Sequence, residues 1–139
     1  MMSFSFSSNV SDVSASPLLQ ASDAVALFNQ PNVRFVDASF HMDKMRDPAA
    51  EFLTERIVGA TRFDIDSVCD KSSPLPHMLP SEEDFGRAMD SLGIGNDTTV
   101  VLYGAKNALA ISRAWWTFKV FGHNNVAIIG RLNFLIAHV

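Results

Sequence analysis

The sequence predicts an α/β fold in which helices cover both faces of a mostly parallel sheet. Short, strongly apolar segments alternate along the chain with segments whose apolar residues recur at helical spacing. The short segments are typical of strands that are buried on both sides. A length of 139 residues, with 47% hydrophobic and 19% charged side chains, suits one globular domain.

The first predicted elements are a helix and a strand. The segment ASDAVALFNQP has Ser22 as its expected N-cap, apolar residues at helical spacing, and Pro31 as its expected stop. Residues 33–39, with the sequence VRFVDAS, predict a strand whose carboxyl end carries Asp37.

A second helix, a short extended segment and a long loop are expected next. Asp47 is the expected N-cap of the helix, and Pro48 takes the first helical position, where proline is favoured. Residues 59–66 predict an extended segment that ends in carboxylates. Residues 67–80 contain three of the six prolines of the chain, so this stretch is expected to be irregular.

Two more helices and two buried strands are expected in the last part of the chain. Ser81 and Asp84 have the spacing of a weak capping box, and the helix that they begin should end at Gly93. The remaining elements are expected at residues 98–103 (strand), 108–122 (helix) and 125–130 (strand).

Composition excludes several classes of function. The net charge of −4 argues against a general binder of nucleic acids or anionic membranes. One cysteine rules out an internal disulfide framework and suits a reducing compartment. No apolar run approaches the roughly 20 residues that span a bilayer. The first residues lack the basic side chains that secretory and mitochondrial targeting segments carry. We expect a flexible Ser-rich segment over 1–17, a domain over 18–139 and a cytoplasmic location, with the mitochondrion left open.

The turn after the strand at 98–103 is a place where open α/β sheets bind anions. Here the turn reads Gly104-Ala105-Lys106-Asn107, and none of these residues is a ready nucleophile. A cysteine-based phosphatase would need a cysteine and an arginine where this chain has Gly104 and Ala110. Lys106 is a candidate for an anion contact, although lysines in loops are more often simply solvated. The sequence therefore predicts a turn at a place where α/β proteins carry a reactive residue, but no such residue in it.

A carboxylate and an imidazole bracket the proline-rich loop. Asp66 ends the extended segment, and His77 lies between prolines that restrict its conformations. A histidine oriented by a carboxylate is part of a nucleophile-activating arrangement; the competing interpretation is an ordinary surface histidine. Cys69 lies between Asp66 and Asp70 in the sequence. Neighbouring carboxylates make a cysteine a poorer nucleophile. The four histidines are scattered, so no metal site is expected.

Two adjacent tryptophans lie on the last predicted helix. Trp115 belongs to an apolar stripe that Trp116 and Val120 do not share. We interpret the stripe as core and the other two residues as a second contact surface, in preference to a ligand platform.

Four segments carry a family resemblance: VDAS, GATRFDIDSVCDKSSPLPHMLPSEEDF, LGIGNDTTVVLYGAKN and SRAWWTFKVFGHNNV. Together they resemble the N-terminal domain of two-domain sulfurtransferases of the rhodanese family, in particular the thiosulfate and 3-mercaptopyruvate sulfurtransferases. The resemblance covers residues 18–128. It implies a three-layer α/β/α fold with a mostly parallel sheet of about five strands.

The same resemblance implies a division of labour between two domains. In that family the C-terminal half carries a catalytic cysteine that accepts sulfane sulfur as a persulfide, and the N-terminal half lacks this cysteine. Gly104 would then stand where the nucleophile stands in the active half. Asp66 and His77 would support catalysis together with a serine of the catalytic half. The implied partners are a catalytic rhodanese domain in the same chain and a small substrate, thiosulfate or 3-mercaptopyruvate, with no cofactor and no metal.

The sequence departs from the family after about residue 130, where it reads RLNFLIAHV. We therefore expect a C-terminally truncated or altered form, inactive by itself, whose last nine residues form at most a short helix. A second interpretation stays open, in which the chain is a non-catalytic rhodanese-like binding or regulatory module that contacts a partner through its tryptophan-bearing face.

Overall fold

The computed structural model describes residues 12–105, 109–130 and 136–138. Within them the chain forms, in order, β1 (Leu18–Leu19), α1 (Ala21–Leu27), β2 (Val33–Asp37), α2 (Pro48–Thr54), β3 (Glu55–Ile57), β4 (Thr61–Arg62), α3 (Glu82–Ser91), β5 (Thr99–Tyr103), α4 (Ile111–Val120), β6 (Val126–Ile129) and β7 (Ile136–His138).

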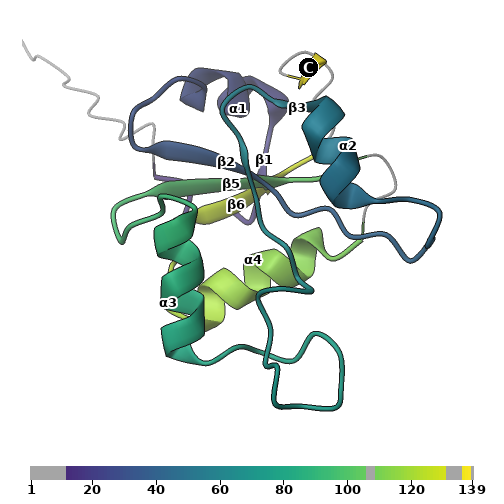
Figure 1. The fold of residues 1–139 in the computed structure, drawn as a ribbon. Coiled ribbons are helices and arrows are strands. Elements are labelled where there is room, and N and C mark those ends of the chain that lie inside the picture. The colour runs from purple at the N-terminus through teal and green to yellow at the C-terminus, as the bar shows by residue number, and fades with distance from the viewer. Residues whose placement is uncertain (1–11, 106–108, 131–135, 139) are drawn as a thin grey trace, which may run out of the picture.

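A five-stranded sheet forms the centre of the fold, with the strand order β1-β6-β5-β2-β4. Every neighbouring pair in it is parallel, and β2 and β5 pair along their whole length from Val33–Thr99 to Asp37–Tyr103. Helix α1 lies on one face of this sheet, whereas α3 and α4 lie on the other (Figure 1). The predicted α/β class, with a parallel sheet between two helical layers, is confirmed.

Side chains alternate between two cores because successive residues of a strand point to opposite faces. Val36 and Leu102 face α3 and α4, where Phe118 is fully buried. Phe35 and Val101 face α1, where Leu27 is almost fully buried. The apolar stripe predicted on α4 is confirmed, because its buried members pack on the sheet while Trp116 and Val120 remain 44% and 46% exposed.

Two predicted helix starts are confirmed by their caps. The Asp47 carboxylate accepts hydrogen bonds from the amides of Ala49 and Ala50 at 2.9 and 3.2 Å, with Pro48 in the first turn. The Ser81 hydroxyl accepts from the Asp84 amide at 3.1 Å. Both contacts satisfy amides that a helix leaves without a partner at its start.

Two other helix starts differ from the prediction. Helix α1 has Gln20 as its N-cap, not Ser22, because β1 pairs with β6 immediately before it and the amides of Asp23 and Ala24 bond to the Gln20 carbonyl. Helix α4 begins at Ile111 instead of 108. The cause lies just before the helix, where Leu109 forms an isolated bridge with Phe40 and Ala110 turns the chain at a φ of 70°.

The end of the chain also differs from the prediction. Residues 136–138 form β7, which pairs antiparallel with β3, so the expected short helix over residues 131–139 is wrong for this segment. Strands β3 and β7 form a separate two-stranded sheet outside the central one. The expected extended segment at 59–66 is reduced to the two residues of β4.

Candidate functional site

The loop between β4 and α3 brings together the carboxylate and the imidazole that the sequence singled out. Nε2 of His77 lies 2.6 Å from Oδ1 of Asp66, although the two residues are eleven positions apart. The His77 side chain is 27% exposed and the Asp66 side chain 65% exposed. An imidazole held by a carboxylate and still open to solvent can exchange a proton with a partner that approaches it.

A tight turn at the start of this loop positions Asp66. The carboxylate of Asp64 accepts hydrogen bonds from the Asp66 amide and the Ser67 hydroxyl, at 3.0 and 2.8 Å. Burial opposes the ionisation of Asp64, but the hydrogen bond from Ser67, the Asp66 amide and the guanidinium of Arg62 together lower its pKa below the usual range. The turn is thus fixed by a carboxylate that stays ionised.

The far end of the loop positions His77. The Asp70 amide donates to the Met78 carbonyl at 2.9 Å, which closes the loop. His77 itself adopts a φ of 59°, a left-handed conformation that is uncommon for a residue with a side chain. Its ring meets Phe40 edge to face, with centroids 4.9 Å apart, and its carbonyl accepts a hydrogen bond from Nη2 of Arg113 at 2.5 Å.

Sequence reasoning missed Phe40 and Arg113. Both lie far from His77 in the chain, and nothing in their local sequence shows that contact. Arg113 had one available signal, because it lies inside the segment SRAWWTFKVFGHNNV that carries the family resemblance.

In the turn after β5, where the sequence places a possible reactive group, the described backbone amide of Ala105 is bonded within the domain. The Ala105 amide donates to the Ser39 hydroxyl at 2.7 Å, and that hydroxyl donates to the Asp37 carboxylate at 2.5 Å. Desolvation by burial raises the pKa of Asp37, against the lowering effect of its bonds to Ser39. The Ala105 amide therefore already has a hydrogen-bond partner within the domain. Lys106, the candidate anion contact, lies outside the described residues.

Cys69 lies beside the Asp66–His77 pair without joining it. Its half-buried thiol donates to the Asp66 carbonyl at 3.3 Å. The carboxylate of Asp66 faces His77 instead. Cys69 is part of the loop's hydrogen bonding and does not lie at the carboxyl end of a strand, where open α/β sheets carry their reactive groups.

The other described histidine side chains have different partners. His41 contacts Glu51, whose Oε2 is 2.8 Å from its Nε2 and which also binds Arg46. His123 donates from Nε2 to the Thr98 carbonyl at 2.8 Å. Within the described residues no group of three or more His, Cys, Asp or Glu side chains is placed to hold a metal ion.

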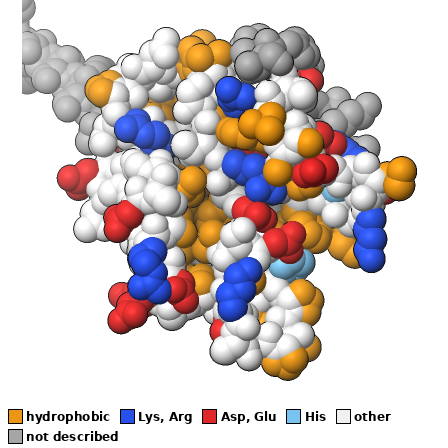
Figure 2. All heavy atoms as spheres, viewed as in Figure 1, with side chains coloured by type: hydrophobic (Ala, Val, Ile, Leu, Met, Phe, Trp, Pro, Cys, Tyr) orange, Lys and Arg blue, Asp and Glu red, His pale blue; other side chains and the backbone are white. Residues whose placement is uncertain are grey.

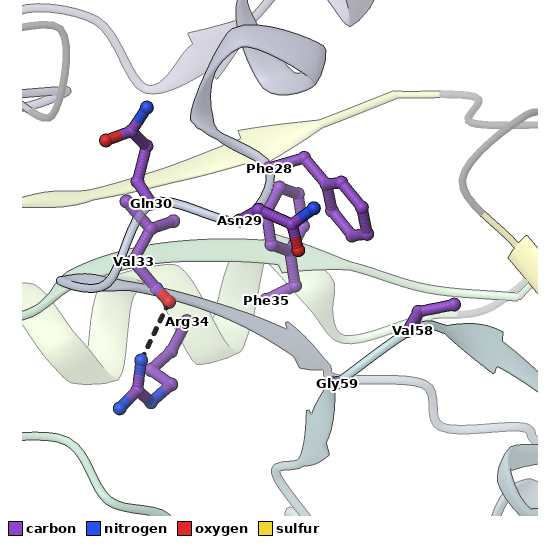
Figure 3. Close-up of a pocket in the computed structure, with 8 residues that line it drawn as sticks. All are labelled: Phe28, Asn29, Gln30, Val33, Arg34, Phe35, Val58 and Gly59. Carbon is purple, nitrogen blue, oxygen red and sulfur yellow. Dashed lines mark hydrogen bonds between the residues drawn. The ribbon is translucent and has the colours of Figure 1, made fainter.

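A separate pocket of about 220 Å³ lies beside the end of α1 and the start of β2 (Figure 3). It is smaller than the roughly 300–1,000 Å³ of most small-molecule sites. Arg34 is its one charged residue, and its Nη1 donates to the carbonyls of Pro31 and Val33 at 3.1 and 3.0 Å. The lining has no thiol, imidazole or carboxylate, so it offers no group for nucleophilic or acid–base catalysis. It comprises Phe28, Asn29, Gln30, Val33, Arg34, Phe35, Val58 and Gly59.

Hydrophobic side chains remain exposed around the Asp66–His77 pair. Figure 2 shows them on the tip of the loop that precedes α3, where Leu75 is 60% and Met78 43% exposed. Leu109 and Trp116 are exposed by about half as well. In the described part of the chain, no helix is long and apolar enough to cross a membrane.

Comparisons with known proteins agree with this fold. The thiosulfate/3-mercaptopyruvate sulfurtransferase 1 of Arabidopsis thaliana is 38% identical over 123 residues, which are 87% of this chain and 32% of that protein. The thiosulfate sulfurtransferase of Bos taurus is 42% identical over 101 residues, or 71% of this chain and 34% of that protein. The crystal structure of the Escherichia coli 3-mercaptopyruvate enzyme SseA superimposes with a TM-score of 0.77 and 35% identity. That match covers 83% of this chain and 45% of SseA.

The chain thus spans about a third of the length of the curated relatives that it matches. The family model of the rhodanese-like domain matches residues 20–130 of the sequence. These residues include every strand of the central sheet except β1. By this match, and by its sheet and helical layers, the chain belongs to the rhodanese-like domain family.

Proposed function

We propose that this chain is the N-terminal, non-catalytic half of a thiosulfate/3-mercaptopyruvate sulfurtransferase, which lends the Asp66–His77 pair to a catalytic rhodanese domain. The observation that carries the proposal is the 2.6 Å contact between His77 and Asp66 on an exposed loop. The turn with Gly104 holds no thiol, so the cysteine that takes up sulfur would belong to the other domain.

The chemistry of 3-mercaptopyruvate gives His77 a defined task. When a thiolate attacks the substrate sulfur, an S–S bond forms and the C–S bond breaks. The electron pair of the broken bond stays on carbon as an enolate, which becomes pyruvate only after it takes up a proton. An imidazole oriented by a carboxylate can supply that proton, directly or through a hydroxyl of the catalytic domain.

Thiosulfate makes no such demand. The bond that breaks is between two sulfur atoms, and its electron pair leaves with sulfite, so no proton has to reach carbon. A comparison of the two donor substrates therefore distinguishes a role of His77 in proton transfer from a role in stability. Only the role in proton transfer depends on which donor is used.

The test uses this chain fused to the catalytic half of the E. coli 3-mercaptopyruvate sulfurtransferase, in place of the part of that enzyme that it matches. His77→Ala should lower turnover of 3-mercaptopyruvate by about 10²- to 10⁴-fold, and Asp66→Asn should lower it equally or less. Turnover of thiosulfate should change far less. Asp90→Asn, on the exposed side of α3, is the matched control and should leave both rates unchanged.

The result that overturns the catalytic role is also defined. If His77→Ala keeps full turnover of 3-mercaptopyruvate in an active fusion, His77 is a loop residue without a part in the reaction. An equal loss with both donors would instead assign the pair to the structure of the loop.

A second candidate function is a binding or regulatory module that works without a catalytic partner. The exposed hydrophobic side chains of Leu75, Met78, Leu109 and Trp116 favour it, because such residues on a soluble surface often mark a contact with another protein. The two proposals differ in one observable. Only the first requires that the fusion regain activity.

A further inference from the structure

Arg113 stands at an unfavourable place for a cation. It is the third residue of α4 and lies in the first turn of that helix, which contains no acidic residue. The N-terminal end of a helix carries a partial positive charge and favours anions. The position of Arg113 is therefore not explained by the stability of its own helix, and its contacts elsewhere have to supply the reason.

Those contacts join α4 to the loop that carries His77. Nη2 of Arg113 donates to the His77 carbonyl at 2.5 Å across 36 positions of sequence. The guanidinium also lies over the ring of Trp116, with Cζ 5.0 Å from the ring centroid. Trp116 is three residues further along the same helix, so its ring lies where it can hold the guanidinium in place.

The carbonyl that Arg113 binds belongs to a residue whose backbone needs support. His77 adopts a φ of 59°, in a region where a side chain crowds the following carbonyl. A conformation of this kind persists only where its surroundings fix it. Phe40 contacts the ring and Asp66 contacts Nε2, and neither holds the backbone. Arg113 does so directly.

We propose that Arg113 is a positioning residue for His77. By holding the His77 carbonyl it maintains the left-handed backbone, and this backbone directs the imidazole to the Asp66 carboxylate. Its effect on sulfur transfer rests on the proposed function above; its effect on the geometry of His77 does not.

The first experiment needs only the purified chain. In nuclear magnetic resonance spectra, the imidazole ¹⁵N shifts of His77 report its hydrogen bond, and the three-bond coupling between its amide and Cα protons reports φ. Arg113→Met keeps a long, unbranched side chain and removes every donor. It should change both signals, while Arg113→Lys, which retains a donor, should restore them in part. Arg87→Met, at an exposed arginine of α3 that contacts Asp84, should change neither.

Wild-type His77 signals in a folded Arg113→Met protein would overturn the proposal. If that variant fails to fold, as judged by loss of the dispersed signals of the core, Arg113→Gln replaces it. Glutamine keeps a polar end but is too short to reach the carbonyl, so the same change in the His77 signals is expected, and wild-type signals would overturn the proposal equally.

The second experiment uses the active fusion. Arg113→Met should lower kcat for 3-mercaptopyruvate by up to about 10²-fold, the scale of a misplaced catalytic group, with KM little changed. Combined with His77→Ala, it should add no further loss, because both changes remove the same imidazole from its place. A full additional loss in the double variant would mean that Arg113 acts elsewhere. If His77→Ala alone has no effect, the proposed function fails, and the spectra of the isolated chain still decide the role of Arg113.

Discussion

Phe40 contacts two segments at the candidate site, one through its ring and the other through its backbone carbonyl. Its ring contacts the imidazole of His77 edge to face, with centroids 4.9 Å apart, and its carbonyl accepts the Leu109 amide at 2.8 Å. The loop before α3 and the segment before α4 are thus held to the same point beyond the end of β2. A ring at this place also shields one side of the imidazole from water, while Asp66 holds the other end.

The isolated chain is expected to have no sulfurtransferase turnover, because sulfur transfer needs a thiolate in an anion-binding turn and this turn carries Gly104. The purified chain would be incubated with thiosulfate and cyanide, and separately with 3-mercaptopyruvate and a thiol acceptor. Cys69→Ser should leave the background rate unchanged. Turnover that this substitution abolishes would identify Cys69 as a nucleophile and refute the assignment.

Phe118→Ala is expected to reduce the free energy of unfolding by about 3–5 kcal/mol, as is usual for a large aromatic side chain removed from a core. Phe118 is fully buried and contacts the rings of Phe63 and Phe85. Val120→Ala, on the exposed side of the same helix, should change it by only about 0.5 kcal/mol. Urea denaturation of the two variants measures the difference, and equal losses would show that α4 does not pack as described.

Stability should fall as the pH drops below neutrality, partly through His123. Burial lowers the pKa of His123 below its ordinary value of 6.5, while its Nε2–H donates to the Thr98 carbonyl. The unfolded chain therefore takes up the proton first, and stability is lost from about pH 6.5 downward until the folded protein also binds it. His123→Gln should reduce the loss of unfolding free energy between about pH 7 and pH 5. An unchanged loss would exclude His123 as a source of the pH dependence.

Asp47→Ala should destabilise the protein by about 1 kcal/mol, the usual effect of removing an N-cap. Its carboxylate binds two amides at the start of α2. Asp23→Ala, at an exposed residue of α1 that does not act as its cap, serves as the control and should stay within about 0.5 kcal/mol. Thermal unfolding compares the two. A similar melting temperature for both variants would mean that the cap contributes nothing measurable.

Local chemistry made much of the fold predictable. The caps at Asp47 and Ser81 and the buried runs of β2, β5 and β6 depend on residues close together in the chain, and these predictions are confirmed. The start of α4 was missed because a distant partner, Phe40, holds Leu109 in a bridge. The β3–β7 pair was missed for the same reason, since strand pairing joins segments about eighty residues apart.

The residue types of the candidate site could be read from the sequence, whereas the distant contacts that position them could not. From a carboxylate and an imidazole on one restricted loop, the contact between Asp66 and His77 was one of two interpretations, beside an ordinary surface histidine. The contact between Arg113 and the His77 carbonyl depends on a backbone conformation that the residue types do not reveal. Their roles in sulfur transfer stay predictions until the fusion is assayed.

The hydroxyl of Ser39 lies beside the start of the turn after β5. It accepts from the Ala105 amide and donates to the buried Asp37, so this amide already has its hydrogen bond before any ligand arrives. An amide that is bonded inside the domain keeps its partner whether or not an anion is present. If a partner docks on this side of the domain, the backbone at Ala105 does not have to become ordered on association, and less conformational entropy is lost there. The bond to the Ser39 hydroxyl thus fixes the backbone at Ala105 in advance of any such contact.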